Sequence, residues 1–224
     1  MNYQLLIDVI ELIAEFETAQ EEKKDYNPDI LGLKEWIANS SAGVSLKPEP
    51  EWEGKASGRS PESIINTLIV HMNRYAKTYS KAAIYNSEFS TQEEFIYLIV
   101  LKAFGEMTKM ELIKKNVQDK PSGMQIIGRL LKQGWVVQNT SDKDRRSKIL
   151  QITDKGLETL EKQMLKIRAA TNIVTGDLSP SEKMELIRLL TKLDHFHKPI
   201  FAENIAPEKL LERAKEQYLK EQVR

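Results

Sequence analysis

The sequence contains no cysteine, which excludes disulfide bonds, thiolate zinc sites and thiol redox sensing. It has no apolar run that approaches the roughly 18 residues needed for a membrane span. The stretch from Met1 to Phe16 carries Asp8, Glu11 and Glu15 and lacks a basic leading segment, so it does not resemble a secretory signal. We therefore expect a cytoplasmic protein.

Catalytic and metal-binding patterns are also scarce. There are only three histidines, and the sequence has no Gly-x-Ser-x-Gly, no phosphate loop and no Cys/His pair. A site built on Glu or Lys stays open, but we expect no enzyme and no cofactor. His195 and His197 are two residues apart on a predicted helix and do not share a face, and His71 is far upstream, so we expect no metal site.

The chain has 224 residues, 41% hydrophobic and 29% charged, which fits a helix-rich protein of one extended domain or two small ones. Its net charge of zero hides an asymmetry. Residues 102–148 contain eleven Lys or Arg and five Asp or Glu. Such a basic patch is typical of a DNA-binding module, although a solvated, lysine-rich helix face would give the same count.

Apolar spacing and capping residues predict a mostly α fold with a small two- to three-stranded β wing. The predicted helices cover residues 3–24, 28–39, 61–85, 92–103, 109–115, 121–132, 154–175, 180–197 and from 207 onward. Residues 41–60 are rich in Gly, Pro and Ser and form a predicted linker after an N-terminal helical extension, 1–40. A core follows over 61–198, and 199–224 form a C-terminal helix.

The middle of the chain predicts a winged helix-turn-helix. Two short helices, 109–115 and 121–132, flank a turn, and two strands follow that are joined by a charged hairpin containing Arg145 and Arg146. In this arrangement the second helix enters the DNA major groove and the hairpin, or wing, lies beside it.

Residues 61–197 resemble the MarR family of bacterial transcription regulators. The matching positions are Asp119-Lys120, Arg129-Leu130, Gly134, Val136, Asp142, Asp144-Arg145-Arg146, Thr153 and Gly156. The resemblance implies a homodimer that binds a palindromic DNA operator, most often as a repressor relieved by a small ligand. It places dimerisation helices in 61–89 and 154–198, the DNA-binding lobe in 90–153, and a ligand pocket between these regions.

The recognition helix supplies the first set of candidate DNA contacts, which are Lys120, Pro121, Ser122, Gly123, Gln125 and Arg129. Gln125 can pair with adenine, and Ser122 can contact a base or a phosphate. Gly123 has no side chain for base recognition but would let the backbone approach DNA. The alternative is that Ser122 and Gln125 are only solvated.

The wing and the first helix of the motif supply the other candidates. In the wing these are Lys143, Arg145, Arg146 and Lys148, with one arginine expected in the minor groove and the other held by an aspartate of the loop. The sequence does not assign these two roles to Arg145 or Arg146. A hairpin in which aspartate and arginine pair only to shape the loop also stays open. Thr108, Lys109, Lys114 and Lys115 are candidate phosphate contacts.

Met72, Tyr75 and Tyr79, with Tyr85 and Phe89 nearby, could line an effector pocket or belong to a dimer core. The first helix, 3–24, is too apolar on one face to stand alone, so we expect it to pack on the dimer. A second functional class remains open, namely a winged helix that binds a protein and does not recognise DNA sequence.

Overall fold

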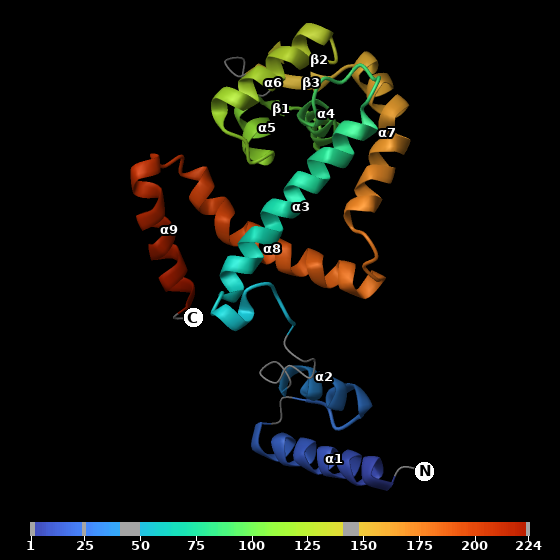
Figure 1. Ribbon diagram of the computed structural model, residues 1–224, viewed down its shortest axis with the longest axis vertical. Helices are drawn as coiled ribbons and strands as arrows, with labels where there is room; N and C mark the ends of the chain where they lie inside the picture. The colour runs from blue at the N-terminus through green and yellow to red at the C-terminus, as the bar shows by residue number, and fades with distance from the viewer. Residues whose placement is uncertain (1–2, 24–25, 41–49, 141–147, 223–224) are drawn as a thin grey trace. The chain divides into compact units, whose positions relative to one another are not determined.

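The computed structural model describes residues 3–23, 26–40, 50–140 and 148–222 (Figure 1). The chain divides into two compact units, 1–64 and 65–224. Among the described helices, none is long and apolar enough to cross a bilayer.

The first unit contains two helices, α1 (Tyr3–Lys23) and α2 (Ile30–Ser40). The buried ring of Phe16 joins them, with its centroid 5.6 Å from that of Trp36. The sequence predicts a start at Pro28, but α2 begins later because Asp29 caps it. The carboxylate of Asp29 accepts the backbone N–H of Gly32 at 2.8 Å.

A short 3-10 turn, η1 (Lys55–Ser57), interrupts the segment before the third helix. Trp52 fixes this turn, because its indole Nε1 donates to the backbone oxygen of Arg59 at 2.9 Å. Gly54 adopts a left-handed backbone with φ of 85°, which favours glycine. The end of the predicted linker is therefore an ordered loop.

The second unit carries the remaining elements. They are α3 (Pro61–Ala83, whose first turn falls in the first unit), α4 (Gln92–Phe104), β1 (Met107–Thr108), α5 (Lys109–Lys115), α6 (Lys120–Gln133), β2 (Val136–Thr140), β3 (Lys148–Ile152), α7 (Asp154–Val174), α8 (Pro180–Ala202) and α9 (Pro207–Gln222). Figure 1 shows α4, α5 and α6 gathered around the strands, with α3, α7 and α8 reaching away as long rods. The mostly α fold with a winged helix-turn-helix is confirmed.

The wing is a three-stranded antiparallel sheet in the order β1-β3-β2. Val136 pairs with Ile152 and Thr140 pairs with Lys148, while Met107 of the short β1 pairs with Leu150. The middle strand β3 thus connects the wing to the segment that precedes α5. This attachment fixes β2 and β3 relative to the helix-turn-helix.

The hydrophobic core lies within the lobe formed by α4, α5, α6, the sheet and the start of α7. Leu98, Leu112, Leu130, Leu150 and Leu160 are fully buried and come from five different elements. Because these side chains interlock, α6 is held as part of a rigid body.

The capping box of α4 and the C-terminal end of α8 differ from the predicted ones. The sequence suggests a capping box of Ser90 with Glu93, but Thr91 and Glu94 form it, one residue later. Glu94 is buried in the core, where it is 2% exposed. At the other end of the unit, α8 does not stop at His197 but continues to Ala202 with Pro199 inside it.

One hydroxyl joins α6 to α7. Thr153 Oγ1 donates to the backbone oxygen of Gly134, which caps the end of α6, at 2.7 Å. Thr153 Oγ1 also accepts the N–H of Gly156 at 3.1 Å and so caps the start of α7. A Cβ on Gly156 would lie 2.2 Å from the backbone oxygen of Trp135, so only glycine fits this junction.

Candidate nucleic-acid interface

The first helix of the motif, α5, is fixed by a capping box at Thr108. Thr108 Oγ1 accepts the N–H of Glu111 at 3.2 Å, and Glu111 Oε2 accepts the N–H of Thr108 at 2.7 Å. Hydrogen bonds from the backbone and the side chain of Thr108 to the Glu111 carboxylate lower its pKa. The hydroxyl of Thr108, a predicted phosphate contact, is therefore already used as the cap of α5.

Asp119 caps α6, so the second helix begins at Lys120 with Pro121 as its next residue. The Asp119 carboxylate accepts the N–H of Ser122 at 2.8 Å. Hydrogen bonds from the backbone and side chain of Ser122 lower the pKa of Asp119, which stays charged at neutral pH. The N-terminus of α6 is thus fixed by contacts within the lobe itself.

The outward face of α6 carries part of the predicted set. Lys120, Pro121 and Gln125 are exposed and Ser122 is partly exposed. The helix also exposes Met124 and Gly128 on this side, which the sequence analysis did not single out. The helical period, counted from Pro121 and Gln125, would have placed Gly128 on the same stripe.

Gly123 does not belong to this face. It is buried, and a Cβ at this position would lie 2.5 Å from Ile113 Cγ1 and 3.0 Å from Tyr97 Oη. The prediction that Gly123 lets DNA approach is wrong, because the residue lets α5 and α6 pack closely. The neighbouring Tyr97 is buried, and this burial raises its pKa to about 12, with smaller contributions from Asp119 and Glu93.

Arg129 has a partner within the lobe. Its Nε donates to Glu94 Oε1 at 2.7 Å, and Glu94 Oε2 accepts the N–H of Ser90 at 2.7 Å. Glu94 is buried, whereas the Arg129 side chain is 40% exposed. This geometry places Arg129 as the residue that ties α6 to the start of α4 and differs from its predicted role as a DNA contact.

The lysines of α5 lie beside the motif. Lys114 and Lys115 are exposed and Lys109 is partly exposed. The Lys115 ammonium lies 3.5 Å from the ring centroid of Phe104, a cation–π contact. Because the Lys115 ammonium is engaged with this ring, Lys114 and Lys109 stay the preferred candidates for phosphate contacts.

The strands of the wing are present, and Lys148 is exposed at the start of β3. The predicted contacts Lys143, Arg145 and Arg146 lie outside the described residues. Their roles stay predictions.

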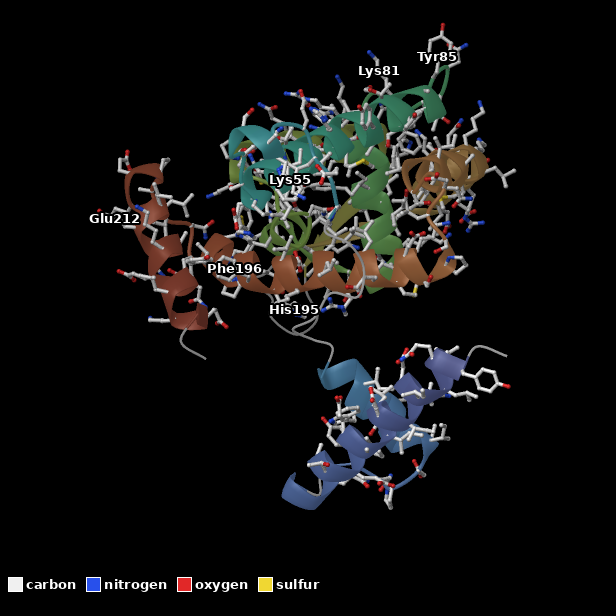
Figure 2. All side chains as sticks on the ribbon, turned by 60° about the horizontal axis from the view of Figure 1, so that its bottom comes forward. Lys55, Lys81, Tyr85, His195, Phe196 and Glu212 are labelled. Atoms are coloured by element: carbon white, nitrogen blue, oxygen red, sulfur yellow. The ribbon has the colours of Figure 1, made fainter. Side chains whose placement is uncertain are left out.

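The predicted effector residues lie on α3. Met72, Tyr75 and Tyr79 are 43%, 54% and 38% exposed, so they are not enclosed by this chain. Tyr85 projects away beyond the end of α3 (Figure 2). A cavity of about 580 Å³ lies elsewhere in the unit, where Phe104, Met107, Lys114, Lys115, Lys198 and Phe201 line it.

Two of the three histidines, His195 and His197, lie on α8. Figure 2 shows His195 and Phe196 on this helix, and the ring centroid of Phe196 is 4.9 Å from that of His197. Within the part of the chain that the structure describes, no group of three or more His, Cys, Asp or Glu could hold a metal ion.

Sequence comparison matches residues 90–147 to the MarR family. A curated relative, the HTH-type transcriptional repressor NicR of Pseudomonas putida, is 27% identical over 103 residues. That alignment covers 46% of this chain and 65% of NicR. The chain thus spans slightly less than two thirds of the curated relative's length.

Solved structures share the fold at lower identity. BpsR of Bordetella bronchiseptica, whose DNA binding is regulated by 6-hydroxynicotinic acid, is 20% identical with a TM-score of 0.55, covering 61% of this chain and 96% of BpsR. A mutant MarR from E. coli complexed with operator DNA is 22% identical with a TM-score of 0.53, covering 58% and 92%. The comparisons thus show that residues 90–147 match the MarR family and that the chain shares the fold of these regulators.

Proposed function

We propose that this protein is a sequence-specific DNA-binding transcription regulator that acts in the cytoplasm as a homodimeric repressor. The observation that carries the proposal is the outward face of α6. There Lys120 and Gln125 are exposed on a helix whose N-terminus is capped and whose opposite face is locked in the core. A rigid helix that presents an amide and a cation suits contacts with an adenine edge and a phosphate.

The local charge supports the same partner. Residues 102–148 carry a net excess of six positive charges in a chain of zero net charge. Such an excess attracts the DNA backbone, and it makes affinity fall as salt rises. Lys114 on α5 and Lys148 on β3 add exposed cations beside α6.

The apolar faces outside the lobe support the homodimer. On α3 the stripe is Ile65, Leu68, Ile69, Met72, Tyr75 and Tyr79, and on α8 it includes Leu186, Leu189, Leu190 and Leu193, all substantially exposed in a single chain. Apolar stripes at helical spacing are rarely left open to water. A dimer built on them would recognise two half-sites about 34 Å apart, as in a palindrome.

We also propose that a small organic ligand releases the DNA, as 6-hydroxynicotinic acid regulates BpsR. Met72, Tyr75 and Tyr79 stay the predicted lining of the pocket after dimerisation. Adding 6-hydroxynicotinic acid to the binding assay gives a first probe of this response.

A different function is favoured by one observation. Pro121, Met124 and Gly128 leave much of the exposed face of α6 without hydrogen-bonding side chains. A winged helix that binds a protein partner would suit such a face. Sequence-specific, salt-sensitive DNA binding distinguishes the two functions.

The test begins with selection of bound duplexes from a random DNA pool by the wild-type protein. A palindromic enriched motif, with binding that weakens steeply as salt rises, is the expected result. Gln125→Ala should relax the preference at one adenine in each half-site and weaken binding by about 5- to 100-fold. Lys209→Ala on α9 is the matched control and should leave both unchanged. A pool that shows no enrichment would overturn the proposal.

A further inference from the structure

Gly128 is the one helical glycine of α6 whose lack of a side chain has no explanation inside the lobe. A Cβ at this position would meet nothing within 4 Å among the described atoms. By contrast, Gly123 of the same helix is needed because Ile113 would lie 2.5 Å from its Cβ. Gly128 also has no positive φ that would require glycine.

The position of Gly128 on the helix is well defined. Pro121, Gln125, Gly128 and Lys132 are exposed at intervals of four, three and four residues, which places them on one stripe. The opposite stripe, with Ile126, Ile127 and Leu130, is buried in the core. Gly128 therefore lies near the middle of the face that points away from the lobe.

Glycine inside a helix is unfavourable, because it loses more backbone entropy on folding than other residues and buries no side chain. Nothing that the structure describes around Gly128 compensates for this cost. A benefit would have to come from a surface that approaches α6 from outside. The bare backbone at Gly128 allows such a surface to come closer by about the width of a methyl group.

We infer that Gly128 is the point of closest approach between α6 and DNA. This inference rests on the proposed function and deepens it, because it makes Gly128 a positioning residue for base recognition. With no side chain at the centre of the stripe, α6 lies deeper in the major groove. Gln125 then reaches an adenine edge, and the exposed Met124 contacts a thymine methyl group. The half-site should accordingly contain adjacent A·T pairs.

The inference predicts that replacing Gly128 by alanine stabilises the fold but weakens DNA binding. Gly128→Ala adds a methyl group where the chain has open space and a residue with higher helix propensity, so the melting temperature should rise by about 2–4 °C. The same methyl group should weaken DNA binding by about fivefold, and Gly128→Leu by about 100-fold, because each extra group separates α6 from the groove. A loss of binding in a more stable protein cannot result from misfolding.

The experiment measures binding of Gly128→Ala, Gly128→Ser and Gly128→Leu to the duplex enriched by the wild-type protein, with melting temperatures in parallel. Gln133→Ala, on the flank of α6 away from the stripe, is the control and should bind as the wild type does. Loss of affinity that grows with side-chain size supports the inference. Tight wild-type binding with equal affinity of all three variants would overturn it while leaving the proposed function intact. A wild-type protein that enriches no duplex would overturn both.

Discussion

Arg129 on α6 and Glu94 on α4 are 35 residues apart in the sequence, yet the arginine Nε lies 2.7 Å from the glutamate Oε1. Glu94 also closes the capping box at the start of α4 through Oε2. A single buried carboxylate thus organises the start of α4 and holds the middle of α6.

Arg129→Ala should lower the free energy of unfolding by about 2 kcal/mol, because it leaves the buried Glu94 without its cation while water partly replaces the half-exposed guanidinium. Urea unfolding followed by circular dichroism measures this change. Arg129→Lys should retain the charge but lose part of the stabilisation, since an ammonium lacks the planar fork. An unchanged urea midpoint in Arg129→Ala would refute a structural role for the pair.

Gly123→Ala should destabilise the lobe by about 1–3 kcal/mol, because the new Cβ would overlap Ile113 Cγ1 at 2.5 Å. This change in stability is opposite in sign to the one expected for Gly128→Ala on the same helix. The loss should be smaller in an Ile113→Ala background, where the overlapping atoms are absent, and a double-mutant cycle measures this coupling. Equal losses in the two backgrounds would show that the packing at Ile113 is not the cause.

The Asp119 cap should make the stability of α6 depend on pH. Its pKa is lowered in the folded protein from the ordinary 3.8 by hydrogen bonds with Ser122. The charged form therefore stabilises the fold above pH 3.8, and this contribution is lost as the pH falls through the lower folded pKa. Asp119→Asn keeps a capping oxygen that does not titrate.

The difference in melting temperature between wild type and Asp119→Asn isolates this group from the other carboxylates. It should be constant near neutral pH and should shrink as the solution is acidified below the ordinary Asp pKa of 3.8. A difference that grows on acidification would contradict the lowered pKa.

The corner between α8 and α9 should depend on Glu203. Arg213 donates to its two carboxylate oxygens from Nε at 2.9 Å and from Nη2 at 2.6 Å. Glu203→Gln removes the charge and should speed hydrogen exchange in α9, measured by mass spectrometry. Glu212→Gln, at an exposed position on α9 (Figure 2), is the control and should leave exchange unchanged. If α9 exchanges hydrogen at the same rate in both variants, the Glu203–Arg213 ion pair does not hold the corner between α8 and α9.

The order of the elements in the lobe could be predicted because each has a local signal. Thr108, Gly134 and Thr153 act as caps where the sequence suggests them, whereas α6 begins one residue before the predicted start at Pro121, with Asp119 as its cap. The end of α8 could not be placed in this way. Its sequence has no capping glycine after His197, and Pro199 suggests a break, but the helix continues because Ile200 is buried.

The candidate site was predictable only in part, because exposure on a helix depends on which face the core takes. Lys120 and Gln125 lie on the outer face as expected, whereas Gly123 lies on the core-facing side of the helix and packs against Ile113. Arg129 could not be assigned from sequence, since its partner Glu94 is brought near only by folding. Such long-range pairs have no signal in local spacing.

The hydroxyl of Thr153 has a mechanical consequence. Since it is bonded to the cap residue after α6 and to the first turn of α7, it couples the directions of the two helices. The 21 residues of α7 make it a lever arm about 31 Å long. A tilt of about 10° at Thr153 corresponds to a displacement of roughly 5 Å at the far end of that arm. Conversely, a displacement at the far end of α7 would rotate α6 slightly about Thr153.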